Sequence, residues 1–303
     1  MDWNVGHDRL SYGYLAIFKN IAALRKEFVY GGYLSAMASP LMLISIWILM
    51  DKPMDWQILV IGYLITLLVY GYDYHKGLGA DSISNPERAL VLEKKARLYP
   101  LALAFEALLL LAMLVVYVNR AILIFALVIG LGGAVYTIAL KGLTRVVPAF
   151  KNVYTSLIWA SAATFMPALQ YSTGLTLFVV LIFNFIFLKC LVNVIFFDIK
   201  DIVSDGTKGL KTIPALIGKK RTVRLLYVLN VLTITPIVIG VYLGVMPMFT
   251  LSWMALPAYV AYYLHRAGRN DGDNIRHLSA IADSEFVLWP VLLFVGKAVI
   301  YFI

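Results

Sequence analysis

Cysteine and charged side chains are scarce in this chain of 303 residues. The single cysteine, Cys190, excludes an intrachain disulfide. Charged residues make up only 14% of the sequence, whereas hydrophobic residues make up 61%, and the mean hydropathy is +0.83. This composition is too apolar for a soluble domain of this length, so it indicates a polytopic membrane protein.

Long apolar stretches account for the composition. A stretch must be long enough to cross about 30 Å of hydrocarbon if it is to span a bilayer as a helix. Nine stretches are candidates: 29–50, 57–72, 98–118, 121–140, 153–169, 175–197, 223–246, 249–266 and 286–302. The sequence therefore predicts an all-α fold with nine transmembrane helices.

The segment ahead of the first span, residues 1–28, has a different pattern. Apolar residues recur there at spacings of three and four, and Arg9, Lys19, Arg25 and Lys26 fall between them. This pattern is typical of an amphipathic helix that lies on a membrane surface. We therefore divide the chain into an interfacial N-terminal helix and a transmembrane domain, 29–303.

The distribution of Lys and Arg predicts the orientation. Only Lys52 and Arg120 lie in the loops after odd-numbered spans, and Lys189 and Lys297 lie within spans. The other Lys and Arg residues lie in the N-terminal segment or around the loops after even-numbered spans. By the positive-inside rule these regions are cytoplasmic in a multi-pass protein of the cell membrane. The net charge of +9 is then mainly an orientation signal, with anionic lipid or substrate as a second use, and nucleic acid is not an expected partner.

Three aspartates, Asp198, Asp201 and Asp205, follow the sixth apolar stretch at intervals of three and four. Lys189, Asn193, Phe197, Asp201 and Asp205 recur at every fourth position, and Asp198 lies three before Asp201. If the helix continues past the membrane, all of them fall on one helical stripe. An ionised Asp facing lipid would cost roughly 2.5 to 3.5 kcal/mol. We therefore expect these acids to border water or a cavity within the protein.

A second acidic region follows the second apolar stretch, on the same predicted side of the membrane. Asp73 and Asp81 are its acids, and Arg88 is the nearest strong base. Clustered carboxylates without His or Cys suit Mg²⁺, which prefers one or two carboxylates together with water and phosphate oxygens. Basic residues beside them fit a phosphate shared between metal and cation. A solvated helix end decorated with Asp and Lys is the alternative interpretation.

The region after the sixth stretch resembles a motif of the UbiA superfamily of intramembrane prenyltransferases. The family pattern is DxxxD followed by GxKTxP. Here Asp201 and Asp205 form the DxxxD pair, and Asp198 is an additional acid upstream. The tail of the motif is matched by four residues: Gly209, Lys211, Thr212 and Pro214.

The region after the second stretch resembles the family's other acidic motif, NxxxDxxxD followed by a segment like NxPxRP. Aligning "NPER" places Asp81 on the last acid, Gly77 on the middle acid and Asp73 on the Asn. Two carboxylates remain, so a metal site is feasible, and we expect Gly77 and Gly79 to break the helix so that Asp73 reaches it. A further family feature, a Tyr shortly before a Lys, is matched in "VYTIALKGLTR" by Tyr136 and Lys141.

The resemblance implies nine helices in a ring around a central cavity. It also implies transfer of an isoprenyl group from an allylic isoprenyl diphosphate to a lipophilic acceptor, aromatic or a quinone precursor, with release of diphosphate. Two Mg²⁺ ions would be held by five acids: Asp73, Asp81, Asp198, Asp201 and Asp205. Their role would be to stabilise the leaving diphosphate.

The resemblance extends to residues that would contact the substrate. The basic residues expected at the diphosphate are Arg88, Lys141, Arg145 and Lys211. Aromatic faces that would stabilise an allylic cation are those of Tyr72, Tyr136 and Phe197. Lys189 and Asn193 are expected to line the cavity, because they share the stripe of the aspartates.

A secondary transporter is the rival interpretation. In such proteins, intramembrane acids and lysines bind coupling ions at broken helices near the membrane midplane. Here the acids lie at the ends of predicted spans on one side of the membrane. Mg²⁺-dependent release of diphosphate from an allylic substrate would separate the enzyme from a transporter that uses the acidic loops to bind cations.

Overall fold

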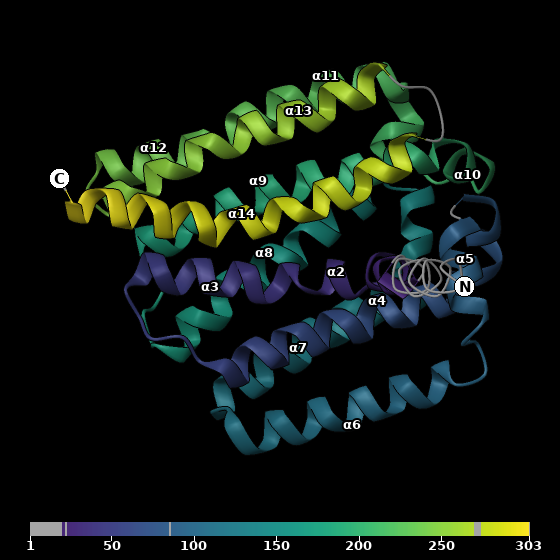
Figure 1. The fold of residues 1–303 in the computed structure, drawn as a ribbon, viewed down its shortest axis with the longest axis horizontal. Helices are drawn as coiled ribbons and strands as arrows, with labels where there is room; N and C mark the ends of the chain where they lie inside the picture. The colour runs from purple at the N-terminus through teal and green to yellow at the C-terminus, as the bar shows by residue number, and fades with distance from the viewer. Residues whose placement is uncertain (1–19, 22, 85, 270–273, 303) are drawn as a thin grey trace, which may run out of the picture.

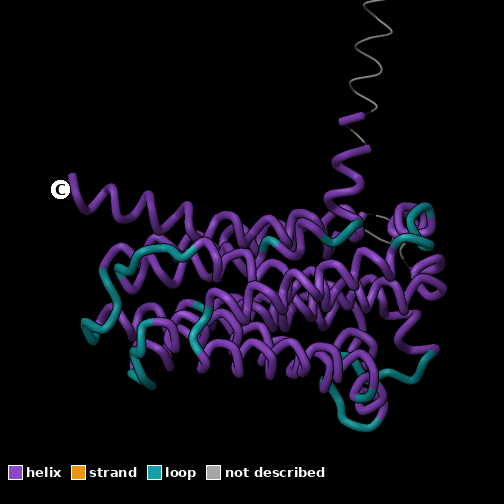
Figure 2. The backbone as a smooth tube through the Cα atoms, turned by 90° about the horizontal axis from the view of Figure 1, so that it is seen from below, coloured by secondary structure: helices purple, strands orange, loops and turns teal. Residues whose placement is uncertain are grey.

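The computed structural model describes residues 20–21, 23–84, 86–269 and 274–302. All regular secondary structure in these residues is helical (Figure 2). The first half of the chain forms α2 (Tyr33–Ala36), α3 (Ala38–Met50), α4 (Trp56–Ser84), α5 (Pro86–Glu93), α6 (Tyr99–Tyr117), α7 (Arg120–Ile138), η1 (Leu140–Arg145) and α8 (Phe150–Gln170). The second half forms α9 (Leu177–Asp198), η2 (Ile199–Asp201), α10 (Ile202–Thr207), α11 (Ile213–Leu232), α12 (Ile234–Tyr242), η3 (Met248–Ala255), α13 (Leu256–Arg269) and α14 (Asn274–Phe302).

The long helices run side by side, and the short helices α5 and α10 lie together at one end of the bundle (Figure 1). Within the described residues, six helical segments are long and apolar enough to cross a membrane. They are Tyr33–Met50, Trp56–Gly79, Tyr99–Tyr117, Leu177–Thr207, Ile213–Tyr242 and Leu278–Phe302. The other predicted spans coincide with α7, α8 and η3–α13, which are helical but shorter or less apolar. The count of nine spans therefore stays a prediction.

The core of the bundle surrounds α9. Phe185 of α9 stacks on Trp253 with ring centroids 4.5 Å apart, and Trp253 Nε1 donates to the carbonyl of Trp289 at 2.9 Å. By contrast, Leu101, Phe105 and other side chains of α6 point outward. Lipid is as apolar as these side chains, so close packing and internal hydrogen bonds hold the inner helices together.

The interfacial helix predicted for residues 1–28 falls largely outside the described residues. Positions 20–21 and 23–30 are described and are helical. The amphipathic N-terminal helix, and the boundary between 1–28 and 29–303, stay predictions.

The expected helix break at Gly77 and Gly79 is wrong. Helix α4 continues through both glycines to Ser84. A glycine costs a helix only about 1 kcal/mol relative to alanine. Contacts of α4 with α2 and α5 at this end easily outweigh that cost.

The stripe expected along an unbroken sixth helix is also wrong in its last turn. Helix α9 ends at Asp198, and the 3₁₀ turn η2 leads into the separate helix α10. A 3₁₀ turn has fewer residues per turn than an α-helix, so it rotates the residues that follow it. Asp201 and Asp205 consequently have different surroundings.

Two charges that lie within predicted spans have partners. Lys189 of α9 forms a buried ion pair with Glu285 of α14. At the opposite end of the bundle, Lys297 Nζ lies 2.7 Å from Asp51 Oδ1. The hydrogen bond and the positive charge of Lys297 lower the pKa of the Asp51 carboxyl. Both lysines thus have a local electrostatic partner outside the acidic motifs.

Candidate active site

A cavity of about 270 Å³ opens among α4, α5, α8, α9, η2 and α14. Carboxylates line it from three directions, because Asp73 belongs to α4, Asp198 and Asp201 to the end of α9 and η2, and Asp283 to α14. Three cationic side chains share the wall: Arg88, Lys151 and Lys200. The two acidic regions of the sequence therefore meet at one cavity, as their predicted location on one side of the membrane requires.

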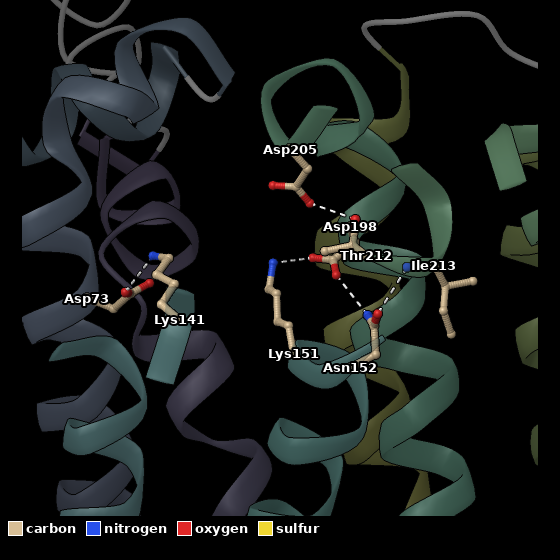
Figure 3. Close-up of polar contacts among 8 residues, drawn as sticks. All are labelled: Asp73, Lys141, Lys151, Asn152, Asp198, Asp205, Thr212 and Ile213. Carbon is tan, nitrogen blue, oxygen red and sulfur yellow. Dashed lines mark hydrogen bonds and ion pairs between the residues drawn. The ribbon is translucent and has the colours of Figure 1, made fainter. Parts of the chain in front are cut away.

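Asp198 is held by two donors from the first turn of α8. Lys151 Nζ donates to Asp198 Oδ1 at 2.5 Å, and Asn152 Nδ2 donates to Asp198 Oδ2 at 2.8 Å. The Oδ1 atom of Asn152 accepts the backbone N–H of Ile213 at 3.2 Å (Figure 3). This network, which we call the Asp198 bracket, joins the ends of α8, α9 and α11. Asp198 and Asn152 are both buried, so the bracket is shielded from water.

Asp205 is also buried and has a hydrogen bond within the protein. Its Oδ2 atom accepts from Thr212 Oγ1 at 2.9 Å, and Asp205 is not among the residues that line the cavity. Thr212 belongs to the GxKTxP segment, and Pro214 occupies the first turn of α11. This segment therefore anchors α10 to the start of α11.

Lys211 and Arg145 stabilise the same segment. The backbone N–H of Lys211 donates to Thr144 O at 2.8 Å, and its carbonyl accepts from Ala149 N at 2.8 Å. Arg145 Nε donates to the carbonyl of Lys208 at 3.2 Å. Neither Lys211 nor Arg145 lines the cavity. A diphosphate contact by either residue stays a prediction.

Asp73 lines the same cavity as Asp201 and has its own cation. Lys141 Nζ of η1 lies 3.3 Å from Asp73 Oδ1, and both side chains are partly exposed (Figure 3). Asp73 and Lys141 also border a neighbouring cavity of about 190 Å³, together with Tyr72 and Gly77. The side chain of Asp81 lies outside those that the structure describes, so its role stays a prediction.

Aromatic rings form much of the remaining wall. Tyr136 stacks on Tyr154 with centroids 5.3 Å apart. Lys200 Nζ lies 5.3 Å from the ring centroid of Phe197, and the Arg88 guanidinium lies 4.3 Å from that of Tyr74. These side chains all line the cavity. Tyr72, the other aromatic residue predicted to contact the substrate, lines only the neighbouring cavity. An electron-rich surface therefore adjoins the charged end of the site.

A second, apolar cavity of about 60 Å³ shares Tyr70, Gly133 and Trp159 with the first. Its own walls come from α3, α4, α7 and α8 and include Leu43, Ile129 and other apolar residues. The polar cavity thus adjoins a mainly apolar space between the helices.

Two stripe residues of α9 differ in their surroundings. Asn193 lines the cavity, and its Nδ2 atom is buried without a hydrogen-bond partner among the described residues. Lys189 is not a lining residue, because the turn of α9 directs it to Glu285 of α14. The expectation that Lys189 lines the cavity is therefore not met.

Several lining residues escaped the sequence interpretation. Lys200 lies between two of the aspartates, and Asp283 lies in the polar "ADSE" interruption before the last apolar stretch. The sequence context of both residues could therefore have indicated them as candidates. Asp283 accepts a hydrogen bond from Ser35 Oγ at 2.7 Å, which connects α14 to α2. Lys151 starts an apolar helix among several basic residues, and nothing in its sequence context distinguishes it.

The carboxylates of the cavity fit a hard cation. Among the described residues, no group of three or more His, Cys, Asp or Glu converges in the manner of a metal cage. Mg²⁺ does not need such a cage, because it keeps several waters and is often bound by one or two carboxylates plus phosphate oxygens. Asp73 and Asp201, which line the cavity together with Arg88 and Lys200, suit that mode.

The apolar helices and the internal cavity with charged and hydrocarbon-lined ends define the class: an integral, multi-pass membrane protein with a site for an amphiphilic molecule. Residues 38–281 match the UbiA prenyltransferase family. The chain belongs to this family and is a prenyltransferase. Comparison with curated proteins gave no match.

Solved structures of archaeal and related proteins share the fold. A UbiA homologue from Aeropyrum pernix K1, in its apo form, is 14% identical with a TM-score of 0.64, and the similarity covers 87% of this chain and 96% of that chain. A UbiA homologue from Archaeoglobus fulgidus, bound to DMAPP and Mg²⁺, is 16% identical with a TM-score of 0.60, covering 90% and 99%. A digeranylgeranylglyceryl phosphate synthase structure is 16% identical with a TM-score of 0.57, covering 91% and 98%.

Proposed function

We propose that this protein transfers an isoprenyl group from an allylic isoprenyl diphosphate to a lipophilic acceptor within the membrane, in a Mg²⁺-dependent reaction that releases diphosphate. An aromatic compound or quinone precursor is the acceptor class we favour. The observation that carries the proposal is the pair of adjoining cavities, one lined by carboxylates and cations and the other mainly by apolar side chains. An isoprenyl diphosphate has the same division between a charged head and a hydrocarbon tail.

The solved relatives support the proposal. The Archaeoglobus fulgidus homologue is bound to DMAPP, an isoprenyl diphosphate, and to Mg²⁺. At 16% identity it shares the fold with this chain, and the family membership makes a similar donor the natural expectation.

The charged end of the cavity would bind the diphosphate. Asp73 and Asp201 would hold Mg²⁺, and when bound the ion neutralises the diphosphate as a leaving group. Arg88 and Lys200 would bind the remaining oxygens through charge-assisted hydrogen bonds. These groups orient the head so that its allylic carbon faces the aromatic wall.

The aromatic and apolar walls would control the transferred group. The faces of Tyr136 and Phe197 would stabilise positive charge at the allylic carbon through cation–π attraction. The apolar extension around Leu43 and Ile129 would hold the hydrocarbon and exclude water, which would otherwise compete with the acceptor. The active-site end would face the cytoplasm by the positive-inside rule.

The transporter interpretation has less support in the geometry. It needs charged groups near the membrane midplane that can bind an ion. The buried charges there, Lys189 and Glu285, neutralise each other and do not line the cavity. The GxKTxP segment has a structural explanation in the hydrogen bond between Thr212 and Asp205.

A transfer assay tests the proposal. The purified protein in lipid nanodiscs would receive labelled allylic diphosphates, from dimethylallyl to geranylgeranyl diphosphate, together with Mg²⁺ and a membrane lipid extract as the acceptor source. We expect label to move to an extractable product with equimolar release of diphosphate, and EDTA to stop both. Asp201→Asn should lower the rate at least ~100-fold, because an amide is a poor ligand for a hard cation.

Glu93→Gln is the matched control, because Glu93 is an exposed acid of α5 outside the cavity. It should keep the native rate. Diphosphate release that is indifferent to EDTA, or a fully active Asp201→Asn variant, would contradict the proposal. Ion uptake into sealed vesicles without diphosphate release would favour the transporter.

A further inference from the structure

Asp198 has both carboxylate oxygens engaged by nitrogen donors. Lys151 Nζ lies 2.5 Å from Oδ1 and Asn152 Nδ2 lies 2.8 Å from Oδ2. Each oxygen therefore uses one of its two lone pairs for a donor, and the Lys151 ammonium beside Oδ1 repels a divalent cation at the remaining lone pair. Mg²⁺ binds oxygen at about 2.0–2.1 Å, so an ion on Asp198 would lie close to the positive charge of Lys151.

The two donors are held in position by the rest of the bracket. Asn152 is completely buried and uses its own Oδ1 to accept the backbone N–H of Ile213. Ala149 lies two residues before Lys151, and its backbone N–H donates to the carbonyl of Lys211 at 2.8 Å. The start of α8 is therefore tied to the start of α11. Lys151 cannot leave Asp198 without abandoning a buried carboxylate.

Lys151 also reaches the cavity that would hold the diphosphate. It lines the wall together with Asp201, and only a quarter of its side chain is exposed. Its ammonium group is a cation fixed at the polar end of the site (Figure 3). On α4, Gly77 borders the neighbouring cavity and stands where the family pattern has an acid, so α4 lacks one carboxylate that could hold an additional metal ion.

We propose that Lys151 is a built-in cation of the diphosphate site, which neutralises Asp198 and a diphosphate oxygen in place of a second Mg²⁺. The site would then bind one Mg²⁺, between Asp73 and Asp201, rather than two. This inference rests on the proposed function, because it assumes an isoprenyl diphosphate as the ligand.

Counting bound metal tests the inference without any turnover. The protein in detergent would be saturated with dimethylallyl S-thiodiphosphate, an unreactive analogue, and titrated with Mn²⁺, while free Mn²⁺ is followed by electron paramagnetic resonance. We expect one Mn²⁺ per chain for the native protein. Lys151→Met should bind two, because it frees the Asp198 carboxylate while keeping the length and apolar stem of the side chain.

Two further variants make the count decisive. Lys208→Met removes an exposed lysine of the same end that does not line the cavity, and it should still bind one Mn²⁺. The double variant Lys151→Met/Asp198→Asn should return to one. Lys151→Met should also weaken binding of the analogue in EDTA about 10-fold, since a charge-assisted hydrogen bond to the diphosphate is lost.

Two Mn²⁺ ions on the native protein would overturn the inference and leave the proposed function intact. A count of one in a folded Lys151→Met variant would overturn it as well. If that variant does not fold, Asp198→Asn decides, because it leaves the count at one under the inference and lowers it from two to one otherwise. No Mn²⁺ binding at all, together with Mg²⁺-independent transfer, would instead contradict the Mg²⁺ dependence in the proposed function.

Discussion

At the scale of single residues, the aspartates of one short motif have different environments. Asp201 and Asp198 both line the cavity, but both oxygens of Asp198 are bonded within the bracket, and Asp205 bonds to Thr212. The carboxylate is chemically the same in all of them. What differs is whether its lone pairs face the cavity or an N–H or O–H donor of the protein. Metal ligation by Asp198 and Asp205, and by Asp81, stays a prediction.

Asp73 provides the residue-scale prediction. Asp73→Ala should lower transfer at least ~100-fold, because it removes a carboxylate from the cavity that Asp201 also lines and leaves Lys141 without its partner. Gly77→Asp should keep activity, since it adds an acid on the same helix where the family pattern has one. Initial rates of diphosphate release at saturating Mg²⁺ would measure both variants. A fully active Asp73→Ala variant would show that Asp73 is not a metal ligand.

At the scale of helices, packing determines where the chain bends. Helix α4 passes through Gly77 and Gly79 without a break, while α9 ends at Asp198 although no glycine or proline stands there. The end of α9 coincides with the bracket, in which donors from α8 bind Asp198. Hydrogen bonds between helices therefore outweigh the local helix propensities at this end.

Two glycines of α4 give the element-scale prediction. A Cβ at Gly79 would meet nothing within 4 Å, so Gly79→Ala should raise the free energy of unfolding by about 0.5–1 kcal/mol through helix propensity. A Cβ at Gly62 would lie 2.7 Å from Ser39 Oγ and 3.0 Å from Leu43 Cδ1 of α3. Gly62→Ala should therefore destabilise the protein, as small residues allow helices to approach closely in membranes.

Thermal unfolding in one detergent would compare the two variants directly. The opposite signs make each variant the control of the other. A stabilising Gly62→Ala would mean that α3 and α4 are not as close as the structure places them. A destabilising Gly79→Ala would mean that the end of α4 needs a flexible residue.

At the scale of the whole molecule, charge and apolar length divide the bundle into two different ends. One end holds the cavity, the bracket and the short helices α5 and α10. The other holds the exposed pair of Lys297 and Asp51. Most of the 26 Lys and Arg residues lie in the N-terminal segment and around the loops after even-numbered predicted spans, so we predict that the first end faces the cytoplasm.

Cysteine labelling tests this orientation. The native Cys190 is buried, so added cysteines would dominate the reaction with a membrane-impermeant thiol reagent. Lys208→Cys, at the cavity end, should react only when the cytoplasmic side is accessible. Met54→Cys, at the opposite end, should react in intact cells. Each position serves as the control of the other, and the reverse pattern would place the active site outside.

The sequence by itself determined the class of the protein, the approximate positions of the helices and the family. The reason is that these properties depend on the length of apolar runs and on short motifs, both of which are local. Asn193 was also identifiable from the stripe, since it lies where α9 is regular, and Asp201 was identifiable from the DxxxD motif.

Only the tertiary structure decided which charges share the cavity. Lys151, Asp198 and Ile213 are brought together from three helix ends, and Asp283 comes from the last helix. Likewise, Lys189 pairs with Glu285 and so does not line the cavity. The direction of such side chains depends on where each helix ends and which neighbour offers a partner. Because those partners are distant in the chain, the spacing of residues along the sequence carries no record of them.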